Sequence, residues 1–350
     1  MTADKKSLCS FDELQTAYLR MTEPAPLVET FRRAATRRNI KTDTEGFFWL
    51  YYASLLLGVG DVEGAKGILT SYHIGLHGLG GIARFPALSI LAEELGIADD
   101  AVSKSAAICR ALDNGVRSRQ FESMVKGRRI AIVGNGPSAV GKGQGAEIDD
   151  HDLVLRFNNY VVKGFGNDYG LRTDIWIRGF GGCDVDDLSA CGRYRYVGIS
   201  GNYRYLPFCS DGQVGILYRD LIERRIEGGY FDPCGYLRMQ RLFSGQPTTG
   251  LAAIYSCLRF GAESVDCYGF SFLEDKPSYE HYFNDQDKEA VRHGLTVVHN
   301  VDSEREFLLR LTRDMRWARG HWPRWMRMFL RPGSVWRRFN PKIGKYERKV

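Results

Sequence analysis

Hydrophobic and polar positions follow two different patterns along the chain, and the change comes near residue 122. Before it, apolar positions recur at helical spacing, and Phe47–Leu57 is the longest apolar run. This run is shorter than the roughly 20 residues that span a bilayer, so it predicts a buried helix. We expect a helical N-terminal region over residues 1–122, whose role the pattern leaves open.

After residue 122, short apolar runs alternate with helical stretches. Six runs predict buried strands: Ile130–Val133, Leu153–Leu155, Thr173–Arg178, Arg195–Ser200, Ser264–Tyr268 and Leu295–Val298. A helix is predicted over Leu251–Phe260, and a capping box from Ser303 to Glu306 predicts the start of another that continues through Leu311. The alternation predicts an α/β fold with a Rossmann-like, open and mostly parallel sheet over residues 123–312.

A glycine-rich stretch follows the first predicted strand. Gly134-Asn135-Gly136 ends the strand, and Gly141, Gly143 and Gly145 interrupt the connection to the next one. Glycine lets the backbone approach a ligand closely, and ligands of open α/β sheets bind beyond the carboxyl ends of the strands. The stretch therefore predicts a nucleotide-binding edge, at which the glycines leave room for a ligand instead of forming a crossover helix.

The same stretch fits the loose dinucleotide pattern Gly134-x-Gly136-x-x-Ala139. An NAD- or FAD-dependent oxidoreductase would need a helix through the later glycines and an acidic residue after the second strand to hold the ribose. The chain has Asn158 at that point. We therefore rank an oxidoreductase below a nucleotide site of another kind.

Four motifs follow one another between residues 128 and 310. The first joins Val133-Gly134-Asn135-Gly136 to Gly141, Gly145, Asp149, His151 and Arg156-Phe157-Asn158; the second comprises Pro247-Thr248-Thr249-Gly250-Leu251 and Val265–Phe270; the third is His281-Tyr282-Phe283; the last pairs His299 with Glu304. In content and order they resemble the motifs of the sialyltransferases, glycosyltransferase family 29. The resemblance implies a one-step, inverting transfer of a sialic-acid-type sugar from a CMP ester to a glycan hydroxyl, without a metal cofactor.

Two histidines are the candidate catalytic residues. His299 follows a predicted buried strand, where α/β folds expose active residues, and the usual pKa of histidine suits proton abstraction near neutrality. The resemblance assigns His299 the same role, that of general base toward the acceptor hydroxyl. For His281 the resemblance implies contact with the donor phosphate and protonation of the leaving group, and a surface histidine is the alternative. Glu304 is expected to orient the loop without reacting.

The candidate binding residues surround the same edge of the sheet. Thr248-Thr249-Gly250 opens a predicted helix, whose free N–H groups form a seat for phosphate. Asn135 and Asn158 match motif asparagines that resemble the nucleotide contacts of the family, and an amide both donates and accepts. Gly136 and Tyr282 complete the predicted CMP-sugar contacts, although packing would explain Tyr282 equally well.

No metal site is predicted. Asp184-Val185-Asp186-Asp187 contains the Asp-x-Asp pattern of metal-dependent sugar transferases, but its glycine-rich flank favours a solvated turn, and a CMP ester has only one phosphate for a metal to bridge. His73 and His77 have a ligand spacing without a third ligand nearby. His151 is expected to be structural, holding the glycine loop.

The cysteines bear on location. The eight cysteines show no zinc spacing. Secretory members of the resembling family carry a disulfide between the first two motifs, and the aligned positions here are Ile130 and Gly261. The N-terminus also lacks the apolar core of a signal peptide. Together these features predict a cytoplasmic, bacterial-type member of the family.

Basic and aromatic residues collect in residues 313–350. The net charge of +6 belongs to this tail, where twelve Lys and Arg face only Asp314 and Glu347, and four of the six tryptophans lie among the arginines. Such segments bind anionic lipid surfaces, so we expect peripheral contact with the inner face of the cytoplasmic membrane. A basic helix packed on the catalytic part is the alternative. Nucleic acid is a third, which we do not expect.

The sequence leaves several functions open. The balance of 44% hydrophobic and 26% charged residues is typical of a soluble globular protein. CMP-Kdo, used in lipopolysaccharide or capsule assembly, is an alternative donor because it is also a CMP ester of a 2-keto sugar acid. A non-catalytic sugar-nucleotide-binding protein is a further alternative. The acceptor, the linkage and the oligomeric state are not predicted.

Overall fold

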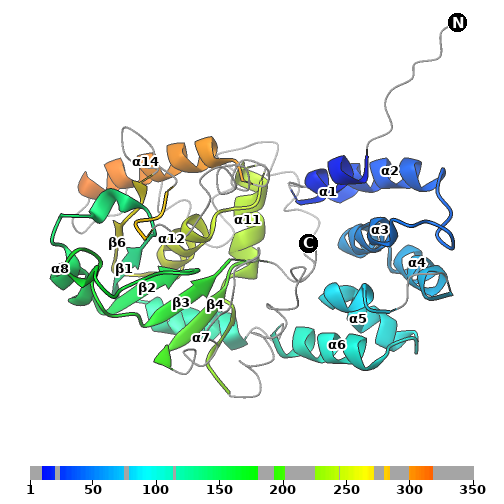
Figure 1. Ribbon diagram of the computed structural model, residues 1–350, viewed down its shortest axis with the longest axis horizontal. Coiled ribbons are helices and arrows are strands. Elements are labelled where there is room, and N and C mark those ends of the chain that lie inside the picture. Colours follow the sequence, from blue (N-terminus) through cyan, green and yellow to red (C-terminus); the bar gives the residue numbers. More distant parts are fainter. Residues whose placement is uncertain are drawn as a thin grey trace, which may run out of the picture.

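A parallel β-sheet forms the centre of the C-terminal part of the molecule (Figure 1). The computed structural model describes residues 10–19, 24–74, 79–112, 116–179, 193–201, 225–243, 245–271, 280–283 and 299–317. Within these ranges the sheet has six strands: β1 (Arg129–Val133), β2 (Leu153–Phe157), β3 (Ile175–Arg178), β4 (Tyr196–Ile199), β5 (Gly228–Tyr230) and β6 (Ser264–Tyr268). The predicted α/β fold with an open parallel sheet is confirmed.

The strand order is β5-β4-β3-β2-β1-β6, and all neighbouring pairs are parallel. The chain builds the sheet outward from β1 to β5 and then returns to place β6 on the free side of β1. The direction of the connections therefore changes at β1. In open α/β sheets this is the point at which ligands bind, beyond the carboxyl ends of the strands.

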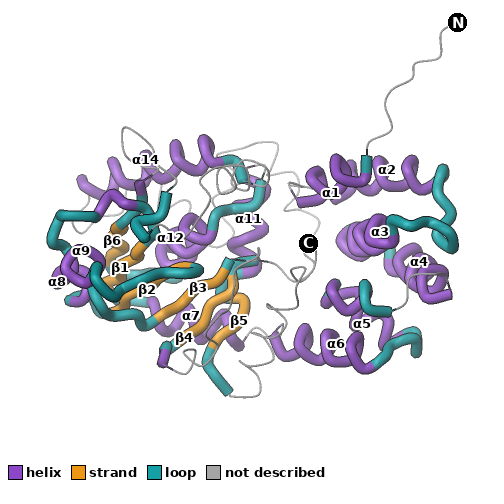
Figure 2. Tube along the Cα trace, viewed as in Figure 1, coloured by secondary structure: helices purple, strands orange, loops and turns teal. Residues whose placement is uncertain are grey.

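Alternate residues of β1 contribute to two different cores, one on each face of the sheet. Ile130 and Ile132 pack in the larger core with residues of four helices, whereas Ala131 and Val133 pack with Tyr169 in the smaller one. The four helices of the larger core are α7 (Val116–Val125), α11 (Pro233–Phe243), α12 (Thr249–Arg259) and α14 (Val301–Trp317). The short helices α8 (Gly145–Asp149) and α9 (Gly166–Tyr169), which lie side by side in Figure 2, contribute Ile148 and Tyr169 to the smaller core.

The N-terminal helices have a core of their own. They are α1 (Phe11–Leu19), α2 (Pro24–Ala35), α3 (Gly46–Gly58), α4 (Val62–Ile74), α5 (Pro86–Glu94) and α6 (Asp100–Leu112). The prediction that Phe47–Leu57 is a buried helix is confirmed, because α3 packs against α1, α2, α4 and α5 and buries most of its residues. α7 belongs to the core of the sheet through Phe121 and Val125, although its first residues fall in the region we predicted to be N-terminal.

The last helix corrects a prediction about its start. α14 begins at Val301, and Asn300 Oδ1 accepts a hydrogen bond from the backbone N–H of Ser303 at 3.4 Å. Asn300 is therefore the N-cap, and the predicted capping box from Ser303 lies inside the helix. The helix also continues past Leu311 to Trp317. The predicted strand Leu295–Val298 and residues 318–350 of the tail lie outside the described residues.

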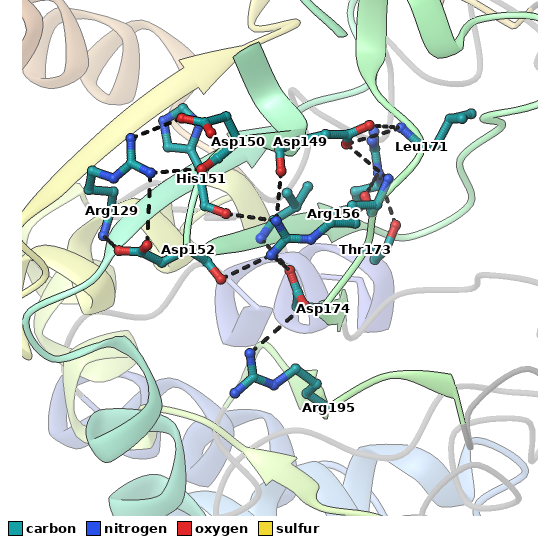
Figure 3. A network of polar contacts seen from close by, with 12 residues as sticks. Arg129, Asp149, Asp150, His151, Asp152, Arg156, Leu171, Thr173, Asp174 and Arg195 are labelled. Carbon is teal, nitrogen blue, oxygen red and sulfur yellow. Dashed lines mark hydrogen bonds and ion pairs between the residues drawn. The ribbon is translucent and has the colours of Figure 1, made fainter. Parts of the chain in front are cut away.

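A network of charged groups joins the amino ends of the central strands (Figure 3). Arg129 at the start of β1 contacts Asp150 and Asp152, and the Asp152 carboxylate accepts a hydrogen bond from the Arg129 backbone N–H at 2.8 Å. Arg172 donates to the backbone carbonyls at the end of α8 and to Asp174. These contacts hold the amino ends of the strands together. The candidate site lies at the other end of the strands, beyond their carboxyl ends.

Candidate active site

Predicted site residues from three elements meet beyond the carboxyl ends of β2 and β3. Gly179 follows β3, and a Cβ added there would lie 2.8 Å from Thr249 Oγ1 and 3.2 Å from Asn158 Oδ1. A Cβ at Gly250 would lie 2.9 Å from the ring of Phe270, which follows β6. The fold thus brings Asn158, Thr249 and Gly250 to the edge at which the sequence predicts nucleotide binding.

The connection after β1 is not a crossover helix. A short 3-10 turn over Pro137–Ala139 is followed by Gly141 and Gly143, whose φ angles are +74° and +64°, and then by α8. Positive φ is costly for residues other than glycine, which explains the glycines at these two positions. The prediction that the glycines interrupt the helix is confirmed.

Glycine is required at positions 134 and 136 for a different reason from the one we predicted. A Cβ at Gly134 would lie 2.7 Å from the Gly269 carbonyl oxygen, and a Cβ at Gly136 would collide with Ser271 Oγ. The Gly136 N–H donates to the Gly269 carbonyl at 2.8 Å, and its own carbonyl accepts from the Tyr169 hydroxyl at 2.6 Å. The chain after β6 therefore occupies this space, which argues against Gly136 as a ligand contact.

The later N–H groups of the loop are also bound by the protein. The Asp168 carboxylate in α9 accepts from the backbone N–H of Gly141 at 2.8 Å and of Gly143 at 2.9 Å. These bonds hold the pKa of Asp168 below its ordinary value. The Asp168 side chain thus binds two backbone N–H groups of the glycine loop and fixes the conformation of the loop.

The two asparagines of the site have opposite free groups. Asn158 Oδ1 accepts from the Gly179 backbone N–H at 2.7 Å, and its amide NH2 has no partner within the part of the chain that the structure describes. Asn135 is turned the other way, because its NH2 donates to the backbone carbonyls of Asn159 at 2.8 Å and Phe157 at 3.4 Å. Since its partners are both carbonyls, Asn135 Oδ1 is the group left without a partner among the described residues. The edge therefore offers one donor, from Asn158, and one acceptor, from Asn135.

Glu304 holds the start of α12. Its side chain is fully buried, and it accepts from the Thr248 backbone N–H at 3.0 Å and from the Thr248 hydroxyl at 2.7 Å. Burial raises the pKa of Glu304 to about 7. Thr248 Oγ1 in turn accepts from the Leu251 N–H at 3.3 Å and caps α12. Glu304 thus positions the residue that starts the helix.

His299 binds the same segment at Gln246, two residues before Thr248. Its Nδ1 lies 2.6 Å from the Gln246 carbonyl oxygen. Because a carbonyl only accepts, Nδ1 carries the proton and Nε2 keeps its lone pair. Burial lowers the pKa of His299, which favours the neutral ring. The structure therefore holds a neutral imidazole in the tautomer that leaves Nε2 basic.

The third motif lies against the turn after β1. The Tyr282 backbone N–H donates to the Asn135 carbonyl at 2.9 Å, which places His281 beside the candidate nucleotide edge. The Tyr282 ring stacks on Tyr169, with 3.9 Å between the ring centroids. His281 itself contacts the ring of Phe283.

His151 makes structural contacts, but with α8 and β6 and not with the glycine loop that we expected it to hold. It is buried, with Nδ1 2.9 Å from the Glu147 carbonyl and Nε2 3.0 Å from an Asp266 carboxylate oxygen. The hydrogen bond to Asp266 raises the pKa of His151. The ring joins the end of α8 to β6, away from the asparagines.

Sequence reasoning missed Asp168 and Tyr169, which support the glycine loop and Tyr282. Asp168 and Gly141 are 27 residues apart, so no local pattern connects them. The one sequence signal was Gly170, whose φ is +70° and which ends α9 directly after these two residues.

Metal ligands do not gather in the described part of the chain, where no group of three His, Cys, Asp or Glu residues could hold an ion. The Asp184–Asp187 segment and His77 lie outside the described residues, and His73 is exposed. Among the described residues, no helix is both long and apolar enough to cross a membrane.

Comparison with known proteins gives one family. A family model described as glycosyltransferase family 29 (sialyltransferase) matches residues 97–179 and 236–315. A CMP-N-acetylneuraminate-beta-1,4-galactoside alpha-2,3-sialyltransferase of Mus musculus is 28% identical over 214 residues, which cover 53% of this chain and 55% of that protein. An alpha-N-acetylgalactosaminide alpha-2,6-sialyltransferase 2 of Homo sapiens is 48% identical over 48 residues, or 14% of this chain and 13% of that protein. The chain spans about half the length of the mouse relative.

The matched ranges contain the candidate residues. The first holds Asn135 and Asn158, and the second holds Thr249, His281 and His299. A solved mammalian sialyltransferase in complex with Gal-beta-1-3GalNAc-ortho-nitrophenol aligns at 18% identity with a TM-score of 0.35, over 57% of this chain and 77% of that chain.

Proposed function

The chain belongs to glycosyltransferase family 29, the sialyltransferase family, and from this premise we propose that it transfers a sialic-acid-type sugar from a CMP ester to a hydroxyl group of a glycan acceptor. The observation that carries the proposal is the state of His299. A neutral imidazole whose Nδ1–H is bound to the Gln246 carbonyl has a basic Nε2, as proton abstraction from an alcohol requires.

The transfer is a single displacement with inversion at the sugar. His299 Nε2 takes the proton of the acceptor hydroxyl as its oxygen attacks the anomeric carbon, and the bond to the CMP phosphate breaks. The leaving CMP takes the electron pair of that bond. His281, held beside Asn135, donates a hydrogen bond or a proton to the leaving phosphate.

The CMP-sugar is bound by both hydrogen-bond donors and hydrogen-bond acceptors of the protein. The Asn158 NH2 donates to an oxygen or ring nitrogen of the nucleotide, and Asn135 Oδ1 accepts from a hydroxyl or amino group. At the start of α12, the backbone N–H groups of Thr249 and Gly250 have no acceptor among the described residues. They and the Thr249 hydroxyl form the seat for the phosphate, and the positive end of the helix dipole supports the charge.

We propose further that the reaction needs no metal and takes place in the cytoplasm, at the inner face of the membrane. A helix start and a histidine at the phosphate supply the stabilisation that a metal gives elsewhere. The basic aromatic residues of the tail are suited to an anionic lipid surface. CMP-Kdo stays as the second donor to be tested, since its carboxylate and CMP ester have the same chemistry.

Release of CMP from CMP-sialic acid and from CMP-Kdo tests the proposal, measured with purified protein in the presence and absence of EDTA. We expect release from CMP-sialic acid that EDTA does not change and that His299→Ala lowers at least about a hundredfold, the usual contribution of a general base. His73→Ala, which removes an exposed histidine of α4, is the matched control and keeps full activity.

Three outcomes would contradict parts of this scheme. Equal CMP release by the His299→Ala protein would remove His299 from the base role. Loss of activity with EDTA would show that a metal is required. No release from either donor, together with quenching of tryptophan fluorescence by NADH, would favour the oxidoreductase that the sequence pattern leaves open.

A further inference from the structure

We propose that Tyr282 is a positioning residue, which clasps the His281 segment onto the ends of β1 and β2 and acts on the transfer through His281 without touching the donor. The proposal rests on the function proposed above, and it assigns Tyr282 a different role from the substrate contact that the sequence predicts. We call the contacts of Tyr282 with Asn135, Val161 and Tyr169 the clasp.

The polar groups of Tyr282 are engaged by the backbone of two other segments. Its N–H donates to the Asn135 carbonyl at 2.9 Å. Its hydroxyl donates to the Val161 carbonyl and accepts from the Val161 N–H at 3.3 Å. Both hydrogen-bonding functions of the hydroxyl are thus used within the protein, and a donor sugar or phosphate would have to break them.

The ring of Tyr282 is fixed as well. It stacks on Tyr169 with an interplanar angle of 19°, and the rings of Phe165 and Phe283 meet it edge to face, each with its centroid at 4.8 Å. Tyr169 is itself tied to the turn after β1, because its hydroxyl donates to the Gly136 carbonyl. The ring therefore packs on a support that is joined to the nucleotide edge.

The clasp determines where His281 stands. His281 precedes Tyr282 directly, so the bond from the Tyr282 N–H to Asn135 sets the position of the His281 backbone relative to the free Oδ1 of Asn135. A general acid has to lie within hydrogen-bond reach of the leaving group, and small displacements of such a group lower the rate steeply. Loosening the clasp should therefore slow the chemical step more than it weakens nucleotide binding.

The test compares Tyr282→Phe with Tyr160→Phe, alone and combined with His281→Ala. Tyr282→Phe keeps the stacked ring and loses the two bonds with Val161. Tyr160→Phe removes a hydroxyl from the same loop, but one that lies 2.9 Å from the Tyr194 hydroxyl and outside the clasp. Hydrogen exchange of the unliganded protein, CMP affinity by calorimetry and kcat with CMP-sialic acid are measured for each variant.

In Tyr282→Phe we expect the Val161 amide to exchange about fivefold faster, which corresponds to one lost hydrogen bond. We expect kcat to fall about tenfold, while the Kd of CMP changes less than about twofold. In the His281→Ala background the same substitution should have no further effect on kcat, because Tyr282 acts through His281. Tyr160→Phe should lower kcat by the same factor with and without His281, if it lowers it at all.

The proposal is wrong if the Kd of CMP rises in parallel with the fall in kcat, since Tyr282 would then contact the donor. It is also wrong if the effects of Tyr282→Phe and His281→Ala multiply. Unchanged exchange at Val161 would show that the clasp does not exist in solution. If the wild-type protein released no CMP from any donor, the proposed function would fail, whereas exchange at Val161 would still decide whether the clasp is present.

Discussion

Asn158 is held in a backbone conformation that few side chains adopt. Its φ is +46°, and three hydrogen bonds fix it there, from its own N–H to Ile177, to its carbonyl from Trp176 Nε1, and to its side chain from the Gly179 N–H. Left-handed backbone is tolerated by asparagine better than by most residues. This strained backbone conformation places the Asn158 amide NH2 at the candidate nucleotide edge.

Asn158→Asp tests this directed donor. The substitution keeps the oxygen that accepts from Gly179 and replaces the free NH2 with a negatively charged oxygen. We expect CMP affinity to fall at least about thirtyfold, since a hydrogen bond is lost and a charge faces the phosphate. Calorimetric titration with CMP measures the effect.

Asn159→Asp is the matched control for this experiment. It adds the same charge one residue later, on an exposed side chain whose oxygen accepts from Arg178 at 2.9 Å. We expect CMP affinity to change less than about threefold. Equal losses in both variants would mean that charge alone matters, and that the Asn158 NH2 does not bind the nucleotide.

Glu304 makes stability depend on pH. Its pKa of about 7 in the folded protein lies above the ordinary 4.5, so the folded state holds the proton more tightly than the unfolded state. The stabilisation of the folded state by the protonated Glu304 carboxyl is complete below about pH 4.5 and is lost as the pH rises through 7. Across that window we expect the free energy of unfolding to fall by roughly 3 kcal/mol in the wild type.

Glu304→Gln should remove this dependence, because a neutral side chain of the same shape keeps an acceptor for Thr248. Thermal unfolding between pH 4.5 and 8 measures the difference between the two proteins. Glu306→Gln, which changes an exposed glutamate of the same helix, should leave the wild-type pH profile intact. A Glu304→Gln profile parallel to that of the wild type would contradict the raised pKa.

At the level of elements, the parts that sequence predicted best are those with their own hydrophobic signal. β1 and β6 are five-residue strands with β-branched residues, and α12 has an apolar face, so each was visible locally. β5 was missed because it is the three residues Gly228–Tyr230, whose glycines show no alternation. Its burial comes from the neighbouring β4 and α7, which only the fold supplies.

Spacing and residue type singled out Asn135, Asn158 and His299 as candidates, and each has a polar atom without a partner among the described residues. Which amide group is free depends on backbone partners that the sequence does not specify. The sequence also does not show the hydrogen bonds of Tyr282 and Gly136, because their partners come from segments far away in the chain.

The contact between α8 and α9 gives a prediction at the element scale. A Cβ at Gly145 would collide with the Gly166 carbonyl oxygen, so Gly145→Ala must push the two helices apart. We expect a loss of about 1–3 kcal/mol in stability and a fall in CMP release, since α9 also carries Asp168 and Tyr169. Chemical denaturation and the CMP-release assay measure the two effects.

Gly67→Ala is the control for the same substitution in open space. Gly67 lies inside α4, and nothing lies within 4 Å of a Cβ placed there. We expect a gain of about 0.5–1 kcal/mol, the usual difference between alanine and glycine in a helix, and unchanged CMP release. If Gly145→Ala behaved like Gly67→Ala, the close approach of α8 and α9 would be wrong.

At the scale of the whole molecule, the N-terminal helices and the sheet have separate hydrophobic cores. The helices α1–α6 bury their apolar residues against one another, in a cluster separate from those of the sheet, and they lie beside the sheet in Figure 1. The family match begins at residue 97, so most of this helical region lies outside it. The candidate site residues belong to the α/β part, and so do both family ranges apart from residues 97–112, which include α6.

The tail gives the last prediction, because its charge concerns the protein as a whole. Residues 318–350 hold most of the twelve basic residues of the tail, so a protein ending at Trp317 loses the excess positive charge. We expect the full chain to sediment with vesicles of phosphatidylserine and phosphatidylcholine, because each basic residue near the surface contributes about 1 kcal/mol to binding. Added salt should release the protein from the vesicles. The shortened protein should stay in solution and release CMP at the same rate, since no candidate site residue lies beyond 317. Equal binding by both proteins would place the membrane contact elsewhere, and loss of CMP release on shortening would show that the tail packs on the catalytic part.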